Sequence, residues 1–228
     1  MSLIIGKKYT EEINELSALG YIIIPFSPPD NLDDEISSHA DLSFFKFDDG
    51  TLFINESLKG EIGESEGSFR RVWVEGLSSP YPNDIKLNCA LIGQNLLCNT
   101  KYASKEILDY AENNNIRIIH TNQGYSKCSV CVVSDNAVIT EDDGIAYLLK
   151  NYQIEVLKIS KGNVYLSDDH YGFIGGASGK LNNEELYFSG DISSHPDYDK
   201  ILEFLNKHNI KPVYNKYRRL NDFGGFIR

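Results

Sequence analysis

The chain has 228 residues, which is enough for one large domain or two small ones. Its hydrophobic content of 41% and charged content of 24% are ordinary for a globular protein. The formal net charge of −11 argues against DNA, RNA or an anionic membrane as the main partner, because each of these requires a concentrated positive surface. The acidity fits a cationic small-molecule ligand, although a simpler interpretation is that it keeps the protein in solution.

Targeting signals and cysteine content narrow the class further. No segment approaches the ~20 apolar residues of a membrane-spanning helix, and the short apolar run near the N-terminus does not have the order of a signal peptide. The four cysteines, Cys89, Cys98, Cys128 and Cys131, are too sparse for a disulfide scaffold. We therefore expect a cytoplasmic protein with reduced thiols, no metal, no cofactor, and no nucleic-acid or membrane partner.

The predicted elements begin with a strand, a helix and a second strand, at 3–6, 10–20 and 21–26. A hairpin with an Asp49-Gly50 turn comes next, between arms at 41–47 and 51–55, and a later strand at 70–76 completes this segment. The stretch 56–69 is acidic and rich in Gly and Ser, so it predicts a loop in place of a helix.

Three later segments share one order of elements: a hairpin of two short strands, a helix, and a third strand. The predicted hairpins cover 89–100, 129–140 and 172–190, the helices cover 104–114, 141–151 and 196–208, and the final strands cover 115–120, 154–160 and 209–214. Ser104 and Thr140 are predicted N-caps, and Pro196 is a predicted first-turn residue. We interpret Gly175, Gly176 and Gly179 as residues that permit close backbone packing or a bend.

The common unit is therefore strand, strand, helix, strand, and it recurs every ~40–50 residues. The N-terminal segment lacks the first strand of its hairpin, and the C-terminal residues 224–228 read GGFIR and can supply it. The predicted fold is a single α/β domain over 1–228, a five-bladed β/α-propeller closed by pairing of the C-terminal strand with the N-terminal strand. Its units are 224–228 with 1–39, 40–87, 88–127, 128–170 and 171–223. A doubly wound α/β sheet is the alternative, but it predicts parallel strands rather than a hairpin before each helix.

This repeated order of elements resembles that of the pentein, or β/α-propeller, superfamily, and the resemblance covers the whole chain. The family includes guanidino-group-modifying enzymes such as arginine deiminase, dimethylarginine hydrolase and amidinotransferases, and also a non-enzymatic ribosome anti-association factor. The enzymes carry a nucleophilic cysteine in a terminal GG-x-H-C stretch. Gly224 and Gly225 match that stretch, but Ile227 stands in the histidine position and Arg228 in the cysteine position. The H-x-D motif of the family has a possible match at His39 and Asp41.

In such a ring, the residues just before each first strand converge on one central mouth. The five preceding stretches are more polar than the strands that follow them, and polar loops on a rigid scaffold are where binding groups usually lie. The predicted ligand-binding residues are His39, Asp41, Asn88, Asn122, Asp169, Arg219, Asp222 and Arg228. Each of them taken singly is also explained as a turn former.

Cys128 is the candidate nucleophile, because a thiolate beside a histidine, lysine or positive dipole can attack a substrate. In this hypothesis His170 is its base, with His39 as the alternative, and Asp168 orients the base, with Asp41 as the alternative. The competing interpretation is that Cys128 and Cys131 are small apolar side chains in an inner strand.

Three functions remain open from the sequence. The first is a binding protein that holds a small cationic or guanidino-like ligand in the polar mouth without covalent chemistry. The second is a cysteine-dependent hydrolase or amidinotransferase-like enzyme that uses Cys128 to act on a guanidino compound. The third is a non-enzymatic scaffold for a protein partner.

Overall fold

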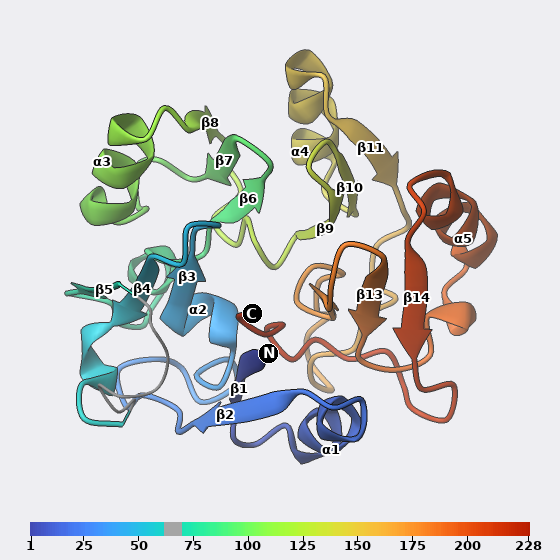
Figure 1. Cartoon of the computed structure of the whole chain (residues 1–228), viewed down its shortest axis with the longest axis horizontal. Helices are drawn as coiled ribbons and strands as arrows, with labels where there is room; N and C mark the ends of the chain where they lie inside the picture. Colours follow the sequence, from blue (N-terminus) through green and yellow to red (C-terminus); the bar gives the residue numbers. More distant parts are fainter. Residues whose placement is uncertain (62–69) are drawn as a thin grey trace.

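The structure, a computed structural model, describes residues 1–61 and 70–228. It has a mixed α/β fold of five small sheets that surround the centre of the molecule, with the longer helices toward the periphery and both termini near the centre (Figure 1). Within these described ranges, no helix is both long enough and apolar enough to cross a membrane.

The elements follow the chain from one sheet to the next. The first sheet contains β1 Ser2–Gly6, α1 Thr10–Ala18 and β2 Ile22–Phe26. The second contains α2 Ala40–Ser43, β3 Phe44–Lys46, β4 Leu52–Asn55 and β5 Arg71–Val74, and the third contains β6 Ala90–Ile92, β7 Asn95–Cys98, α3 Lys105–Asn113 and β8 Arg117–His120. The fourth contains β9 Val130–Ser134, β10 Ala137–Thr140, α4 Asp143–Leu149 and β11 Glu155–Lys158, and the fifth contains β12 Ser178–Lys180, β13 Glu185–Phe188, α5 Tyr198–Lys207 and β14 Lys211–Tyr214.

Four of the sheets have three strands with the same pattern of pairing. Their first strand is antiparallel to the second, and the second is parallel to the third. A parallel pair needs a long crossover connection, and α3, α4 and α5 supply it in the last three sheets. In the first sheet, β1 and β2 are parallel and α1 connects them. The predicted order of strand, strand, helix and strand is thus present in the last three sheets.

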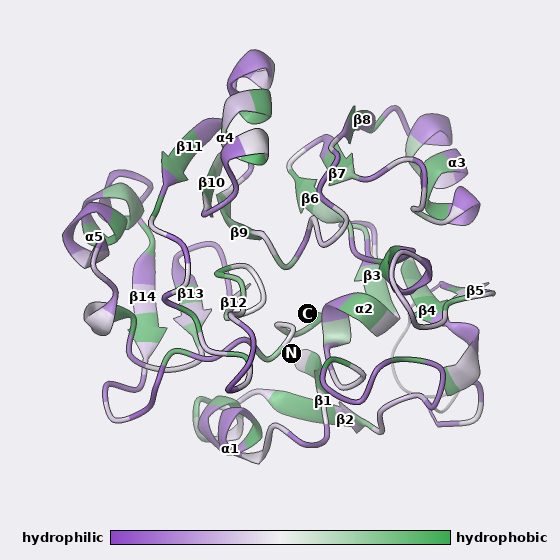
Figure 2. Ribbon diagram, turned by 180° about the vertical axis from the view of Figure 1, so that it is seen from behind, coloured by the Kyte–Doolittle hydropathy of each residue, from purple (hydrophilic) through white to green (hydrophobic). Residues whose placement is uncertain are grey.

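Five apolar clusters join each sheet to its neighbour, and the fifth sheet to the first. This packing requires amphipathic helices, and Figure 2 shows both hydrophobic and hydrophilic residues on α1, α3, α4 and α5. The clusters pair residues of successive sheets, namely Ile4 with Phe44, Phe53 with Leu96, Ile92 with Val138, Ile139 with Phe188, and Tyr187 with Ile5. Full burial of each such side chain contributes roughly 1.5–3 kcal/mol to the free energy of unfolding. Because the clusters lie between successive sheets, this stabilisation is distributed around the molecule.

The C-terminal segment lies against β1, as the sequence predicts, but through a short contact. The Ile4 N–H donates to the Ile227 carbonyl at 2.8 Å, and the Ile227 N–H donates back to the Ile4 carbonyl at 3.0 Å. These two bonds form an isolated antiparallel bridge rather than a strand. The segment before the bridge cannot be extended, because Gly224 and Gly225 have φ values of +69° and +62°.

The fifth hairpin starts later than predicted. The residues 172–178 were expected to form its first arm, but residues 174–177 form a turn and β12 begins at Ser178. The reason is the close approach of another loop, because the Gly176 N–H donates to the Cys128 carbonyl at 3.0 Å, and a side chain at Gly175 would overlap the Lys127 carbonyl. The glycines therefore serve backbone packing, as we interpreted them.

Two predicted helix starts also differ. The N-cap of α4 is Asp142, whose carboxylate accepts the Ile145 N–H at 2.8 Å, because the Thr140 hydroxyl donates to the Ser129 carbonyl instead. Pro196 precedes the N-cap of α5 rather than lying in its first turn. Ser104 caps α3 as predicted. Of the predicted loop 56–69, residues 56–58 form a 3₁₀ turn, and residues 62–69 lie outside the described residues.

The terminal bridge predicts a specific sensitivity to proline. Ile227→Pro removes the N–H that donates to the Ile4 carbonyl, so we expect the free energy of unfolding to fall by roughly 1–3 kcal/mol. Urea unfolding followed by circular dichroism measures this loss. Ile227→Val keeps both backbone bonds and is the matched control, and equal stability of the two variants would show that the bridge contributes nothing.

Candidate functional site

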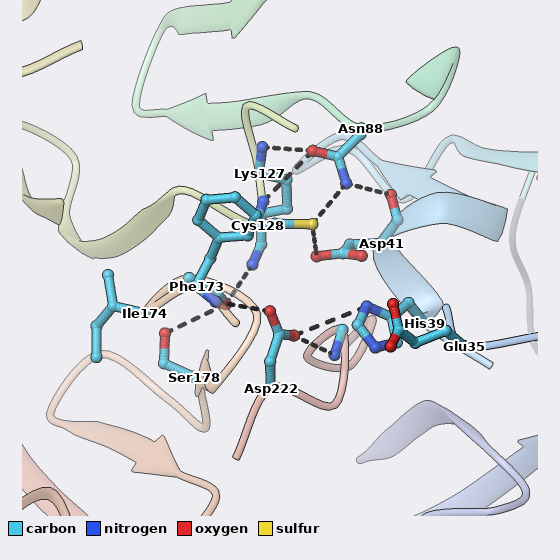
Figure 3. A network of polar contacts seen from close by, with 12 residues as sticks. Glu35, His39, Asp41, Asn88, Lys127, Cys128, Phe173, Ile174, Ser178 and Asp222 are labelled. Carbon is cyan, nitrogen blue, oxygen red and sulfur yellow. Dashed lines mark hydrogen bonds and ion pairs between the residues drawn. The ribbon is translucent and has the colours of Figure 1, made fainter. Parts of the chain in front are cut away.

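Polar side chains from four of the five sheets meet at the centre of the molecule (Figure 3). His39 and Asp41 come from the start of the second sheet, Asn88 precedes β6, Cys128 precedes β9, and Asp222 follows β14. All five side chains are buried, with residue exposures of 1–3%. Buried polar groups are costly unless they are paired, so their convergence defines a candidate site, which we call the central network.

Cys128 lies between Asp41 and Asn88. Its Sγ is 3.1 Å from Asp41 Oδ2 and 3.1 Å from Asn88 Nδ2. The Asn88 amide also donates to the Asp41 carbonyl at 3.2 Å, and Asn88 Oδ1 accepts the Lys127 N–H at 2.8 Å. Asn88 therefore fixes the thiol and the Asp41 backbone in one arrangement, with the thiol positioned to donate to the Asp41 carboxylate.

Asp222 holds the opposite side of the central network. Its Oδ2 accepts the Phe173 N–H at 2.8 Å, and its Oδ1 accepts the Gly224 N–H at 3.0 Å. His39 Nδ1 is 3.7 Å from the same Oδ1, in a pair that is almost fully buried. One carboxylate thus connects the loop before β12, the C-terminal segment and the start of the second sheet.

Glycine makes this arrangement possible at two positions. A Cβ on Gly176 would overlap the Asp222 carboxylate, and a Cβ on Gly224 would overlap His39. Gly224 also has a positive φ, which L side chains rarely adopt. At these two positions the backbone therefore approaches the Asp222 and His39 side chains more closely than any other residue would allow.

Burial sets the protonation of the network. Burial raises the pKa of Asp41 from 3.8 to about 6, while the charges of Lys127 and His39 oppose the increase and Asp222 adds to it. Burial, followed by the charges of Asp41 and Asp222, raises the pKa of the Cys128 thiol well above its ordinary value of 9.0. At neutral pH the thiol is therefore protonated, which makes it a weak nucleophile in this state.

Glu141 is a carboxyl group of the site that the sequence interpretation missed. It follows β10, is 4% exposed, and its Oε1 accepts the Ile174 N–H at 3.2 Å, one residue after the amide that Asp222 holds. Burial raises its pKa from 4.5 to about 7, and the charge of Asp222 contributes to the increase. Its position at the end of a second strand was the available signal, since Asn55 and Ser189 at comparable positions are also buried and polar.

Several acceptors and donors of the site are buried without a hydrogen-bond partner in the described part of the chain. They are Asp41 Oδ1, Glu141 Oε2 and His39 Nε2. Each belongs to a side chain that is at most 4% exposed. A buried carboxylate oxygen without a partner is costly to keep, and a cation bound beside it would satisfy it.

The other predicted site residues lie elsewhere. The His170 side chain is 65% exposed and its Nδ1 is 3.2 Å from Glu35 Oε2, so the structure does not bring it to Cys128 as a base. Asp168 accepts the Tyr165 hydroxyl at 3.1 Å, and Arg219 stacks over the same ring at 4.0 Å. The remaining three are Asn122 and Asp169, which are exposed, and Arg228, which donates to the Leu181 carbonyl at 3.1 Å.

Two further features bound what the site can hold. Among residues 1–61 and 70–228, no group of three or more His, Cys, Asp or Glu side chains is arranged to hold a metal ion. A surface cavity of about 340 Å³ lies away from the central network, between η2 Asn83–Ile85 and the start of α3, with Lys86, Lys101 and Lys105 in its lining. Because its five residues are only 1–3% exposed, the central network is a closed cluster, and a ligand reaches it only if covering side chains move.

Solved structures with a similar fold are pentein-type guanidino-modifying enzymes. An amidinotransferase of Microseira wollei from the saxitoxin biosynthetic pathway has a TM-score of 0.59 and 11% identity, covering 96% of this chain and 77% of that chain. A Campylobacter jejuni agmatine deiminase variant with substrate bound has a TM-score of 0.56 and 12% identity, covering 98% and 91%. A Pseudomonas aeruginosa dimethylarginine dimethylaminohydrolase variant complexed with citrulline has a TM-score of 0.55 and 10% identity, covering 96% and 94%. Identities this low establish similarity of fold alone.

By sequence, the chain belongs to DUF6873, a family of unknown function whose model matches residues 3–227. A comparison with curated proteins gives no match.

The two buried carboxyls predict how stability depends on pH. In the folded state both pKa values lie above the ordinary ones, so folding favours the protonated carboxyls. The stability that this difference provides is fully present below about pH 4, and it is lost as the pH rises through about 6 for Asp41 and about 7 for Glu141. Each difference corresponds to roughly 3 kcal/mol. We therefore expect the fall in unfolding free energy between pH 4 and 8 to shrink by about that amount in Asp41→Asn and in Glu141→Gln.

Urea unfolding at four or five pH values tests this expectation, with the change across the pH range as the readout. Asp169→Asn alters an exposed carboxylate and is the matched control, so its profile should follow the wild type. Parallel profiles for all three variants and the wild type would mean that the buried carboxyls titrate normally.

Proposed function

We propose that the protein binds a small organic cation, of the guanidinium or amine class, at the central network. The observation that carries the proposal is the set of buried carboxyls, Asp41, Asp222 and Glu141, of which two have an oxygen without a partner in the described chain. A guanidinium group offers five N–H donors in one plane and remains charged in a buried site, because its pKa exceeds 12. It therefore matches several carboxylate oxygens that come from different directions.

The fold supports the same ligand class. The similar solved structures include an agmatine deiminase with substrate bound and a dimethylarginine dimethylaminohydrolase, enzymes whose names identify guanidino compounds as substrates. We further propose that the five sheets are the blades of a five-bladed propeller formed by residues 1–228, with the Ile4–Ile227 bridge as its closure. In that architecture the central network lies where the blades meet, which is where a ligand contacts several of them at once.

Binding of cations is tested by thermal unfolding and calorimetry at pH 8. We expect agmatine, arginine or methylguanidine to raise the melting temperature, since a ligand at 100 times its dissociation constant adds about 2.7 kcal/mol of stability. Asp41→Asn should weaken the affinity about 10-fold or more, because it removes a charge that faces the ligand.

Methylurea is the matched control ligand, because it resembles methylguanidine in shape but carries no charge. Asp169→Asn is the control variant and should bind as the wild type does. The proposal fails if no cation shifts the melting temperature at millimolar concentration, or if methylurea is as effective as methylguanidine.

A second candidate function is a reaction at Cys128, and the contact of its Sγ with Asp41 at 3.1 Å favours it. The cation and the thiol would lie in the same cluster, and a bound cation would offset the negative charges that raise the thiol pKa. In this reaction Sγ bonds to the guanidino carbon, one C–N bond breaks, the amine leaves with a proton, and water later releases a urea. Asp41, whose Oδ2 lies 3.1 Å from Sγ, is the group positioned to accept the thiol proton, and His39 lies beside Asp222.

Alkylation by iodoacetamide reports the state of the thiol, and release of amine separates the two candidates. Without a ligand we expect Cys128 to react slowly at pH 7, because its thiol is buried and protonated. If the protein is an enzyme, release of amine from the guanidino compound stops in Cys128→Ala while binding persists. Amine release that survives Cys128→Ala, or that never occurs in the wild type, removes the enzymatic candidate and leaves the binding protein.

A further inference from the structure

Three aromatic rings form a continuous row beside the central network. The ring centroids of Tyr81 and Tyr125 are 5.6 Å apart, and those of Tyr125 and Phe173 are 6.3 Å apart. Both separations lie within the range of direct aromatic contact. The row joins three segments that are distant in sequence, the loop before η2, the loop before β9 and the loop before β12.

The inner end of the row is bonded to the central network. The Phe173 N–H donates to Asp222, and Figure 3 shows the Phe173 ring on the same side of Asp222 as Lys127 and Cys128. Tyr125 belongs to the loop that carries Cys128, since its carbonyl accepts the Ser129 N–H at 3.0 Å. The two inner rings are therefore fixed relative to the carboxylates.

The row also leads outward. The five central side chains are 1–3% exposed, Phe173 and Tyr125 are partly exposed, and Tyr81 at the outer end is 49% exposed. This gradient distinguishes the row from ordinary core packing, where large aromatic side chains are enclosed on all sides. It makes the row the aromatic surface that a ligand would contact before reaching the carboxylates.

A carboxylate lies behind the middle ring. The Tyr125 hydroxyl donates to Asp84 Oδ2 at 2.7 Å, and Asp84 is 2% exposed. Burial and this bond raise the pKa of Tyr125, so the hydroxyl remains a donor. Donation to a carboxylate increases the negative potential of the ring face, which favours contact with a cation.

The absence of a side chain at Gly124 provides the space that the Tyr81 ring occupies. Gly124 has no side chain, and a Cβ at that position would overlap the Tyr81 ring and approach Ile85. The Tyr81 ring therefore lies directly on the backbone of the loop that leads to Cys128. Gly124→Ala should displace the ring without altering a charge.

We propose that the ligand of the central network carries an aromatic group next to its cationic group, and that Tyr81, Tyr125 and Phe173 bind this part. The ligand class is thus an aralkyl guanidine or amine rather than a simple alkyl one. This inference rests on the proposed function, because the row gains its meaning from a cation held by Asp41 and Asp222. Offset stacking on two or three rings supplies the additional affinity.

The test compares benzylguanidine with methylguanidine by isothermal titration calorimetry, because the two share a cationic head and differ in the ring. In the wild type we expect benzylguanidine to bind about 10-fold more tightly, which corresponds to about 1.4 kcal/mol. Tyr81→Ala and Gly124→Ala should remove most of that gain while the affinity for methylguanidine is kept. Tyr147→Ala is the control, since that tyrosine is 77% exposed on α4.

The possible results separate this inference from the proposed function. Equal affinity of the two guanidines in the wild type, or a gain that persists in both Tyr81→Ala and Gly124→Ala, overturns the aromatic subsite and leaves cation binding intact. Failure of every cation to bind overturns both. The wild-type comparison stands even if one variant does not fold, and circular dichroism checks the folding of each.

Discussion

The carboxylate of Asp222 is the constraint on which the centre of the molecule depends. It holds the N–H groups of Phe173 and Gly224 and faces His39, so it joins the fifth sheet, the C-terminal segment and the second sheet. Removing it would leave two buried donors unpaired, at about 1–3 kcal/mol each. The same carboxylate adds to the pKa increases of Asp41 and Glu141, so one group connects fold and site.

The order of elements could be predicted because each unit repeats the same hydrophobic pattern. Amphipathic stretches such as 104–114 and 196–208 contain α3 and α5, and polar turns separate the paired strands. The fifth hairpin shows where pattern alone fails. Residues 172–178 are apolar enough for a strand, but the backbone of the Cys128 loop occupies the adjacent space and forces a turn. A tertiary contact of this kind leaves no periodic signal in the sequence.

The site could be predicted in part, for a related reason. The structure brings together five of the predicted side chains. Four of them precede a strand, His39 and Asp41 in the second sheet, Asn88 in the third and Cys128 in the fourth, and Asp222 follows the last strand. His170, Asp168 and Asp169 lie in a loop of similar composition, yet that loop is exposed. The sequence placed Glu141 at a predicted helix start, next to Asp142. The structure shows that Glu141 is buried and Asp142 is partly exposed, a difference that two adjacent acidic residues do not reveal in the sequence. Composition identifies polar loops, whereas packing decides which of their side chains face the centre.

The buried carboxyls have one more consequence, which concerns proton exchange with solvent. With pKa values raised to about 6 and about 7, Asp41 and Glu141 are partly or wholly protonated in mildly acidic solution. A positively charged guest bound beside either carboxyl would favour its ionised form and expel protons into the buffer. The heat measured on mixing would then depend on the ionisation enthalpy of that buffer, and the affinity would increase as the solution becomes more alkaline.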